Sequence, residues 1–574
     1  MNYTKEYLKW LESPLLTDSE KDELLSIADD EKTKAMRFES FMTFGTAGLR
    51  STMNMGIGCM NRFTVAVTTR ALAALVKKCG GEKRGVVIAY DSRLNSEVFA
   101  RVSALVLATE GVKAYIFDGI RPTPELSFAV RELGTLAGIN ITASHNPKEY
   151  NGYKAYWEDG AQIGPEQAEA VSHEIAKYDT LDYGDLVDYG TAVKDGLIVE
   201  LGADFDEKYI AAVLNTSISK SVIEDVSDEL KVVYTPLHGA GYRLVPEVFR
   251  RRGLKNLYTV DTQMIPDGSF PTVKKPNPEY SDVFTDGIKI ANEVGSDLII
   301  ATDPDSDRVG VMARNSSGDF VTVSGNQMGA LLLDYAIKAR RELGILPEGA
   351  FAVKSIVSTD MAYKIAEAQG IKLHDVLTGF KYIGEVIKDY ESRSDADAFI
   401  LGFEESYGYL LGSYARDKDA VEASMIILEM TAYYKKRDMT LCDALESLYR
   451  EYGLYRESML DVYMEGYDGV ERRKRVMSSL RESVPSDFCG VAVSKVGDYL
   501  TREVKNLATG ECESTGQPES DVLYYTLENG DKIIVRPSGT EPKIKIYILA
   551  HATDSEELDG KIKKYTEKAK SLTE

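Results

Sequence analysis

Short apolar runs alternate with longer amphipathic segments from about residue 85 to residue 435. This alternation predicts parallel α/β domains, because each buried strand is followed by a helix that covers the sheet. The pattern begins at 85–90 and restarts at 230–234 and at 351–354. We therefore predict three related mixed α/β domains that arose by duplication, although their residues show no clear one-to-one repeat. The strands expected are 85–90, 113–117, 138–141, 230–234, 256–260, 297–301, 351–354 and 398–401, with a helix near 359–369.

The last part of the chain has a different pattern. Residues 522–527, 532–535 and 543–549 predict an antiparallel meander, with a turn at Glu528-Asn529-Gly530-Asp531. A smaller α+β domain therefore closes the chain, and we expect the charged segment near 455–485 to be a helical connector. Apolar residues spaced four and three apart predict a final helix with one buried face: Leu558, Ile562, Tyr565, Ala569 and Leu572.

Length and composition narrow the possible number of domains and the possible classes of partner. At roughly 150 residues per domain, 574 residues suggest about four domains, and 44% apolar residues suffice for packed cores. The 68 basic and 91 acidic side chains give a net charge of −23, which disfavours nucleic acid and anionic membranes as partners. A phosphorylated substrate would need a local basic cleft. Five scattered cysteines, no signal-like start and no spanning apolar run lead us to expect a soluble cytoplasmic protein.

The first candidate loop is Thr142-Ala143-Ser144-His145-Asn146-Pro147, just after an apolar strand. Open α/β sheets bind ligands at that edge, and a serine hydroxyl there can accept a phosphoryl group. An Asn-Pro turn with an exposed serine is the alternative. A Ser–His hydrolase is disfavoured, because neighbours in an extended chain point to opposite sides and the Gly-x-Ser-x-Gly elbow is absent.

The second loop carries Asp303, Asp305 and Asp307 after the expected 297–301 strand. Alternate residues of an extended chain share a face, so we expect the three carboxylates to converge on a cation such as Mg²⁺. Without a cation, their repulsion would raise their pKa values. Arg308 beside them is suited to a substrate phosphate. An aspartyl-phosphate mechanism with Asp303 as nucleophile, and a solvated acidic turn, remain alternatives.

Two further loops complete the set. Glu404 and Ser406 follow the 398–401 strand, where a carboxylate can accept hydroxyl groups of a sugar; a surface acid is the alternative. The downstream charged run 416–419 includes Lys418, which either offsets an anion or is simply solvated. There is no nucleotide-binding glycine motif. The last loop, for which an ordinary turn is the alternative, offers a guanidinium, two hydroxyls and a close-approach glycine to an anion: Arg536, Ser538, Gly539 and Thr540.

Taken in this order, these loops resemble those of the α-D-phosphohexomutase superfamily, and the chain looks most like its long phosphoglucomutases. The likeness covers nearly the whole chain. The sugar loop reads Gly-Phe-Glu-Glu-Ser-Tyr-Gly-Tyr, unlike the Gly-Glu-Met-Ser-Gly-His of shorter phosphomannomutase-type relatives. Other matching segments are Phe44-Gly45-Thr46-Ala47-Gly48-Leu49-Arg50, Thr235-Pro236-Leu237-His238-Gly239, Pro266-Asp267-Gly268, Pro276-Asn277-Pro278-Glu279 and Thr378-Gly379-Phe380-Lys381.

The resemblance implies three related α/β domains and a smaller α+β one around a central cleft. It implies that Ser144 is the phosphoserine and that, with Asp303, Asp305 and Asp307, it holds Mg²⁺. Lys154 would be the general acid–base, needing a lowered pKa, and Arg50 and His145 would support it. The residues that would bind substrate are Arg308, Thr378, Gly379, Lys381, Glu404, Ser406, Lys418, Arg536, Ser538, Gly539 and Thr540. We expect domains at 1–205, 206–324, 325–455 and 490–574, with a connector at 456–489.

These expectations lead to a phosphoglucomutase, an isomerase that interconverts α-D-glucose 1-phosphate and D-glucose 6-phosphate. Glucose 1,6-bisphosphate would be its intermediate and activator. Its partner would be a small phosphosugar, and the protein would be a monomer or a homodimer. Phosphomannomutase or phosphopentomutase activity is the alternative within the superfamily. A phosphatase of the serine or aspartate type and an inactive sugar-phosphate sensor are the alternatives outside it.

Overall fold

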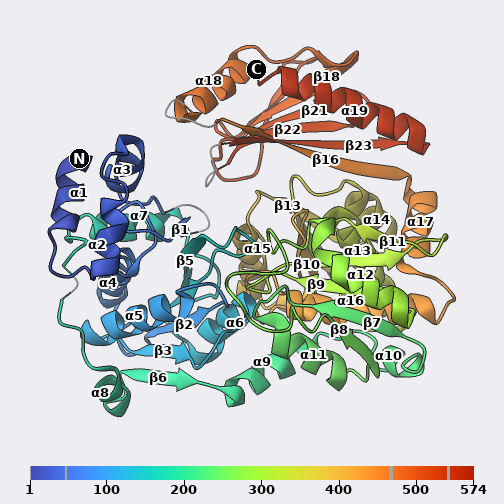
Figure 1. The fold of residues 1–574 in the computed structure, drawn as a ribbon. Coiled ribbons are helices and arrows are strands. Elements are labelled where there is room, and N and C mark those ends of the chain that lie inside the picture. Colours follow the sequence, from blue (N-terminus) through green and yellow to red (C-terminus); the bar gives the residue numbers. More distant parts are fainter. Residues whose placement is uncertain (1, 45–47, 183, 465–468, 539–542, 574) are drawn as a thin grey trace. The chain divides into compact units, whose positions relative to one another are not determined.

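The computed structural model describes residues 2–44, 48–182, 184–464, 469–538 and 543–573 (Figure 1). The chain divides into two compact units. The first comprises Met1–Val323, Gly384–Ala396 and Gly408–Asp438, and the second comprises Ser324–Ile383, Asp397–Tyr407 and Met439–Glu574. Each unit is described separately below. Among the described residues, no helix combines the length and apolar character needed to cross a membrane.

The first unit begins with three helices that have their own core. Trp10 is fully buried there, and its ring meets Phe38 and Phe63 edge-on. Asn2, Thr17 and Asp30 each accept backbone N–H groups at a helix start, so the sequence marks where these helices begin. The helices are α1 (Tyr3–Leu11), α2 (Asp18–Leu25) and α3 (Glu31–Phe38).

A six-stranded sheet follows, in the order β1-β5-β4-β2-β3-β6. Strands β2 and β4 are buried along their whole length, as expected for a sheet covered on both faces. The crossovers from β2 to β3 and from β3 to β4 run in opposite directions across the sheet, so the usual right-handed connection predicts α5 and α6 on opposite faces. The elements are β1 (Leu49–Thr52), α4 (Arg62–Lys78), β2 (Val86–Tyr90), α5 (Ser96–Thr109), β3 (Ala114–Phe117), α6 (Thr123–Leu133), β4 (Ala137–Ile141), β5 (Tyr150–Trp157), α7 (Pro165–Ile175), α8 (Tyr189–Lys194) and β6 (Ile198–Leu201).

The second sheet of this unit has the order β11-β10-β9-β7-β8. Strand β9 is fully buried, and α16 packs against α11, α9 and α10. The elements are α9 (Ala203–Asn215), α10 (Val222–Asp225), β7 (Lys231–Thr235), α11 (Gly241–Arg251), β8 (Asn256–Thr259), η1 (Ser281–Phe284), α12 (Thr285–Val294), β9 (Leu298–Thr302), β10 (Val309–Arg314) and β11 (Phe320–Val323), with α16 (Ala420–Lys435) from later in the chain. Strand β15 (Gly408–Leu410) is assigned to this unit but is not part of this sheet; it is the edge strand of the sheet β13-β12-β14-β15.

In the second unit, β12 lies between β13 and β14, and all three strands are parallel. Helix α13 packs against β14 and α14. Helix α15 (Phe380–Ser392) follows β13 in the chain and extends into the segment assigned to the first unit. The other elements are α13 (Gly325–Glu342), β12 (Phe351–Ser355), α14 (Met361–Gln369), β13 (Lys372–Val376), η2 (Ala396–Ala398), β14 (Phe399–Glu404) and α17 (Leu441–Tyr452).

The three sheets repeat one strand order. The first strand of each round lies between the second and the third: β2 between β3 and β4, β7 between β8 and β9, and β12 between β13 and β14. In each round the third strand leads into one of the loops singled out above. The serine loop follows β4, the aspartate loop follows β9 and the Glu404 loop follows β14. The predicted duplication is therefore visible in topology, and it puts all three loops at equivalent positions.

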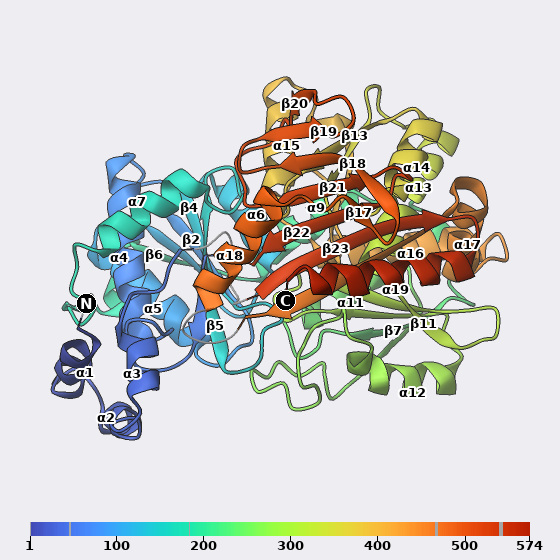
Figure 2. The same ribbon diagram turned by 90° about the horizontal axis from the view of Figure 1, so that it is seen from above.

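The C-terminal sheet contains the predicted meander β21-β22-β23, seen in Figure 2 beside β18. The helix expected from about 455 starts only at Gly469. Residues 454–463 instead form β16, paired with β23, because Leu454, Leu460 and Val462 alternate toward the core in the two-residue period of a strand. The predicted face of α19 does pack on this core. The elements are β16 (Leu454–Tyr463), α18 (Gly469–Glu482), β17 (Asp487–Phe488), β18 (Val491–Asp498), β19 (Glu503–Asn506), β20 (Cys512–Ser514), β21 (Leu523–Leu527), β22 (Lys532–Pro537), β23 (Lys543–Ala552) and α19 (Ser555–Ser571).

Candidate active site

Ser144 lies in the turn between β4 and β5, 3% exposed, with its hydroxyl directed at the aspartate loop. Its Oγ donates a hydrogen bond of 2.6 Å to Asp303 Oδ2. The backbone of Ser144 is left-handed, with φ of 50°. For that reason the expectation that His145 points away is wrong: its Nδ1 lies 3.2 Å from Ser144 Oγ. Burial, with Arg308 and Arg50 nearby, lowers the pKa of His145 well below its usual value.

The aspartates converge as predicted, but the local conformation is not an extended chain. Residues 303–308 form a turn between antiparallel β9 and β10, with Ser306 at φ of 52°. One ligand oxygen from each of Asp303, Asp305 and Asp307 lies within 4.8 Å of the others, and all three residues are buried. The backbone N–H groups of Asp307 and Arg308 donate to Asp303 Oδ1, which fixes the turn. Oδ1 of Asp305 and Oδ1 of Asp307 are buried without a hydrogen-bond partner among the described residues.

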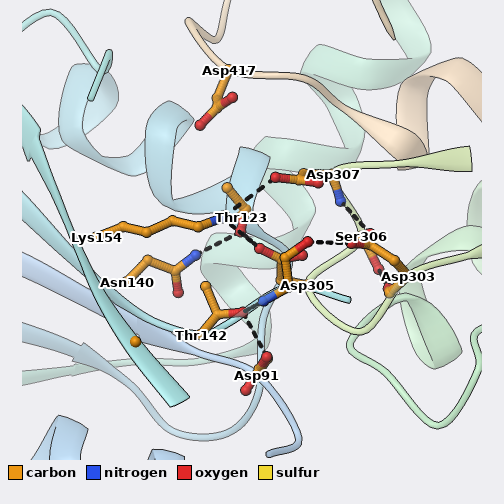
Figure 3. A network of polar contacts seen from close by, with 12 residues as sticks. Asp91, Thr123, Asn140, Thr142, Lys154, Asp303, Asp305, Ser306, Asp307 and Asp417 are labelled. Carbon is orange, nitrogen blue, oxygen red and sulfur yellow. Dashed lines mark hydrogen bonds and ion pairs between the residues drawn. The ribbon is translucent and has the colours of Figure 1, made fainter. Parts of the chain in front are cut away.

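Two lysines contact this acidic cluster, of which Lys154 is seen in Figure 3. Lys154, on β5, contacts Asp305 Oδ2 at 2.8 Å and Asp307 Oδ2 at 3.4 Å, and Lys418 contacts Asp307 Oδ2 at 2.9 Å. The expectation of a lowered pKa for Lys154 is therefore wrong: burial opposes its charge, but Asp305 and Asp307 raise its pKa.

The expected rise in carboxyl pKa values holds for one aspartate only. Burial, together with Asp305 and Asp307, raises the pKa of Asp303 well above its usual value. Burial also acts on Asp307, but Lys418, Lys154 and Arg308 outweigh it and lower its pKa. Burial and Asp307 act to raise the pKa of Asp305, but Lys154 outweighs them, so this pKa is lowered as well. The prediction of raised pKa values assumed that no positive charge was present, whereas Lys154 and Lys418 supply positive charge beside Asp305 and Asp307.

Several residues that position this cluster escaped the sequence analysis. Thr123, at the start of α6, donates from Oγ1 to Asp305 Oδ2 at 2.7 Å, and its N–H donates to the Asp305 carbonyl at 2.8 Å. Asn140 Nδ2 donates to Thr123 Oγ1 at 2.6 Å (Figure 3). Tyr156 donates to Asp417 Oδ2 beside Lys418. The sequence could have indicated Thr123, because Pro122-Thr123 lies between a strand and the following helix, at the sheet edge where α/β domains bind ligands.

The two arginines assigned to this site bond different loops: Arg50 bonds the serine loop, and Arg308 contacts the aspartate loop. Arg50, on β1, donates from Nη1 to Asn146 Oδ1 of the serine loop at 2.7 Å. Arg308 contacts Glu279 at 2.5 Å and Asp307 at 3.8 Å. Glu279 belongs to the Pro276-Asn277-Pro278-Glu279 segment noted in the sequence. Ser144, Lys154, Arg50, His145, Arg308 and Lys418 thus all lie in the first unit with the aspartates.

The remaining candidates lie in the second unit. The N–H of Gly379 donates to Glu404 Oε1 at 2.7 Å, which brings the Thr378–Lys381 segment to the end of β14. Gly379 has φ of 120°, a conformation that favours glycine. Glu404 and Lys381 are buried, and Ser406 and Thr378 are half-buried. Two segments that are separate in sequence therefore form one polar surface in this unit.

The anion loop is described in part. Arg536 is the penultimate residue of β22, and Ser538 follows the strand and donates its N–H to the Lys543 carbonyl at the start of β23. Arg473 on α18 donates from Nη1 to the Ser538 carbonyl at 2.8 Å, which adds a guanidinium that the sequence analysis missed. Gly539 and Thr540 lie outside the described residues.

The three α/β sheets share one strand order. In the first unit, a serine, three aspartates and two lysines meet in one buried cluster, which has the chemistry of a phosphotransfer enzyme. Comparison with known proteins identifies it further. Residues 42–182, 207–318 and 324–452 match the family models of phosphoglucomutase/phosphomannomutase, alpha/beta/alpha domains I, II and III. The chain belongs to this family, and it is a phosphotransferase of the isomerase class.

Individual relatives agree. The chain is 36% identical over 96% of its length to a phosphoglucomutase of Staphylococcus saprophyticus, 97% of which is covered. It is 36% identical to a Staphylococcus aureus phosphoglucomutase, with 92% of both chains covered. Its fold is similar to a putative phosphomannomutase from Thermus thermophilus, at a TM-score of 0.68 and 22% identity, covering 93% of this chain and 99% of that one.

Proposed function

We propose that this enzyme interconverts α-D-glucose 1-phosphate and D-glucose 6-phosphate through a phosphoserine at Ser144 and a glucose 1,6-bisphosphate intermediate. The observation that carries the proposal is the 2.6 Å contact from Ser144 Oγ to Asp303 within the buried cluster of carboxylates and lysines. The phosphoglucomutases of the two Staphylococcus species support glucose as the sugar.

The donor atoms fit a hard divalent cation. Mg²⁺ prefers oxygen ligands, and the cluster offers three carboxylates and a hydroxyl; two of its buried carboxylate oxygens have no hydrogen-bond partner in the part of the chain that the structure describes. We assign Ser144, Asp303, Asp305 and Asp307 as the residues that would hold it. Bound there, the ion would offset negative charge on the phosphoryl group in transfer.

The chemistry of the chain's own groups follows from their positions. In the first half-reaction, the bond between phosphorus and Ser144 Oγ breaks, and a bond forms to the free hydroxyl oxygen of the hexose monophosphate. Lys154, whose raised pKa means that it starts protonated, gives its proton to Ser144 Oγ as that oxygen leaves, and it then takes up the proton of the attacking hydroxyl. In the second half, the other phosphoryl group returns to Ser144 from the reoriented bisphosphate. His145 and Arg50 support the serine loop in both steps.

Substrate contacts are assigned to both units. Arg308 and Lys418 would offset phosphate charge beside the aspartates. Glu404 and Ser406, with Thr378, Gly379 and Lys381, would hold sugar hydroxyls. Arg536, Ser538, Gly539 and Thr540 would hold the phosphate that is not being transferred. We propose the domains 1–205, 206–324, 325–455 and 490–574, each contributing one loop. The segment 456–489, between the last two domains, pairs and packs with the C-terminal domain through β16 and α18.

The test is a coupled assay with glucose, mannose and ribose 1-phosphates side by side, each primed with glucose 1,6-bisphosphate. We expect the highest kcat/KM with glucose 1-phosphate and no net release of inorganic phosphate. Preference for mannose or ribose 1-phosphate would replace the substrate assignment by phosphomannomutase or phosphopentomutase. Stoichiometric phosphate release, indifferent to the bisphosphate, would replace it by a phosphatase.

A further inference from the structure

Arg93 lies immediately after β2, and its side chain is fully buried against the serine loop. Its guanidinium donates to four carbonyl groups, three in that loop and one at the start of β5. Nη2 reaches the carbonyls of Ser144 and Asn146, both at 2.5 Å, and Nη1 reaches those of Pro147 at 2.9 Å and Tyr150 at 3.0 Å. A planar guanidinium can present its donors in this fixed fork, whereas a lysine ammonium offers three donors from a single point.

Asp91, two residues before Arg93, extends the hydrogen-bond network around the serine loop. Its Oδ1 accepts from the Arg93 N–H and from Ser96 Oγ, and its Oδ2 accepts from Thr142 Oγ1 at 2.6 Å. Thr142 Oγ1 in turn accepts the Ser144 N–H at 2.8 Å. The N–H and the carbonyl of Ser144 are therefore both held by one network, and Ser144 is the residue with the left-handed backbone.

The other face of Arg93 meets the segment 265–272, which connects it to the aspartate loop. The Phe270 ring centre lies 5.1 Å from the guanidinium carbon, and Gly268 pairs with the Arg93 backbone so closely that an added Cβ would lie 2.3 Å from Leu94 N. His238 joins both ends of this segment, bonding Ile265 O and Thr272 Oγ1 at 2.9 Å each.

The connection ends at the aspartate turn itself. Two residues after His238, the N–H of Ala240 donates to the Pro304 carbonyl at 2.8 Å. Between them, a Cβ on Gly239 would lie 2.4 Å from Pro304 Cα, so this contact leaves no room for a side chain. A continuous set of packed and bonded groups thus runs from the serine loop through Arg93 to the turn that carries Asp303 and Asp305.

We infer that Arg93 is a positioning residue, whose guanidinium fixes the backbone of the serine loop so that Ser144 Oγ meets the aspartate cluster. The inference rests on the proposed role of Ser144. Nη1 and Nη2 of Arg93 bond backbone carbonyls, so loss of the guanidinium should act on the rate of phosphoryl transfer and leave substrate affinity unchanged. Displacement of a reacting group by about 1 Å typically costs about 100-fold in rate.

The experiment compares Arg93→Lys with wild type and with Arg252→Lys. Arg252 is a matched control: it is a buried arginine that bonds the Lys220 carbonyl and lies 3.8 Å from Glu429, away from the aspartate cluster. Steady-state kinetics give kcat and KM, and intact-protein mass spectrometry after mixing with glucose 1,6-bisphosphate gives the rate at which Ser144 is phosphorylated. We expect Arg93→Lys to lower kcat and that rate about 100-fold, with KM within about threefold, and Arg252→Lys to match wild type.

Three results would overturn the inference: wild-type rates in Arg93→Lys, an equal loss in Arg252→Lys, or a rise in KM without a fall in kcat. If Arg93→Lys does not fold, Thr142→Val decides instead, because it cuts the Asp91–Thr142–Ser144 part of the network with little change in volume. A fall in kcat there supports the inference, and unchanged kcat refutes it. Inactivity of wild type towards every hexose phosphate would instead refute the proposed function.

Discussion

Replacing Thr123 with valine tests how α6 holds the aspartate cluster. Thr123 Oγ1 donates to Asp305 Oδ2 at 2.7 Å and accepts from Asn140 Nδ2 at 2.6 Å, and the residue is fully buried. Valine has nearly the same shape but no hydroxyl. The change therefore removes both hydrogen bonds while leaving the backbone bond from the Thr123 N–H to the Asp305 carbonyl in place.

The magnitude follows from those two bonds. A hydrogen bond to a charged group contributes about 1.5–3 kcal/mol, and stranding a buried amide such as that of Asn140 costs about 1–3 kcal/mol. Partial relaxation leads us to expect a loss of about 3 kcal/mol in the free energy of unfolding. Groups that orient a metal ligand typically change metal affinity or activity by about 10–100-fold, so we expect half-saturation by Mg²⁺ to shift upward within that range.

Two measurements check this: urea unfolding of the metal-free protein, and activity titrated with Mg²⁺. Thr123→Ser is the control, because it keeps the hydroxyl, and we expect it to lie close to wild type in both. Thr123→Val with wild-type Mg²⁺ dependence would show that Thr123 does not orient Asp305 as a metal ligand, whatever its effect on stability.

Other consequences can be measured in the same way. Asp307→Asn should weaken Mg²⁺ activation at least about 10-fold, and an unchanged Mg²⁺ titration would remove Asp307 from the metal site. Burial raises the pKa of Glu457 from 4.5 to about 7, so the unfolded chain loses this proton first, and stability should fall by up to about 3 kcal/mol between about pH 4.5 and 7. Glu457→Gln should flatten that dependence in denaturant titrations at pH 5 and 7.5; a slope equal to that of wild type would contradict the assignment. Asp531 is buried and accepts from the His551 N–H and from Tyr565, so Asp531→Asn should destabilise the C-terminal sheet by about 2 kcal/mol in thermal unfolding without changing KM.

The sequence predicted the fold class because the buried strands are short, apolar and regularly spaced. The prediction was wrong at β16, where the charged residues of the segment suggested a helix, although Leu454, Leu460 and Val462 keep the two-residue period of a strand. Pairing with β23 decides that segment, and this partner lies about 90 residues further along the chain.

Within the site, the loops and the convergence of Asp303, Asp305 and Asp307 followed from the sequence, since each loop ends a buried strand. The orientation of His145 did not, because it depends on the left-handed backbone of Ser144. Nor did the raised pKa of Lys154, which requires knowing that two aspartates from another sheet lie beside it. The first property depends on a backbone conformation that residue types alone do not fix, and the second depends on contacts between residues far apart in the sequence.

The central claim, that Ser144 carries the phosphoryl group, is tested most directly by labelling the enzyme with radioactive glucose 1,6-bisphosphate. With the label in the phosphate groups, we expect one label per chain on Ser144, stable to hydroxylamine, absent from Ser144→Ala, and transferred to product when unlabelled hexose phosphate is added. A hydroxylamine-sensitive label, which would mark an acyl phosphate on Asp303, or a label that persists in Ser144→Ala, would contradict it.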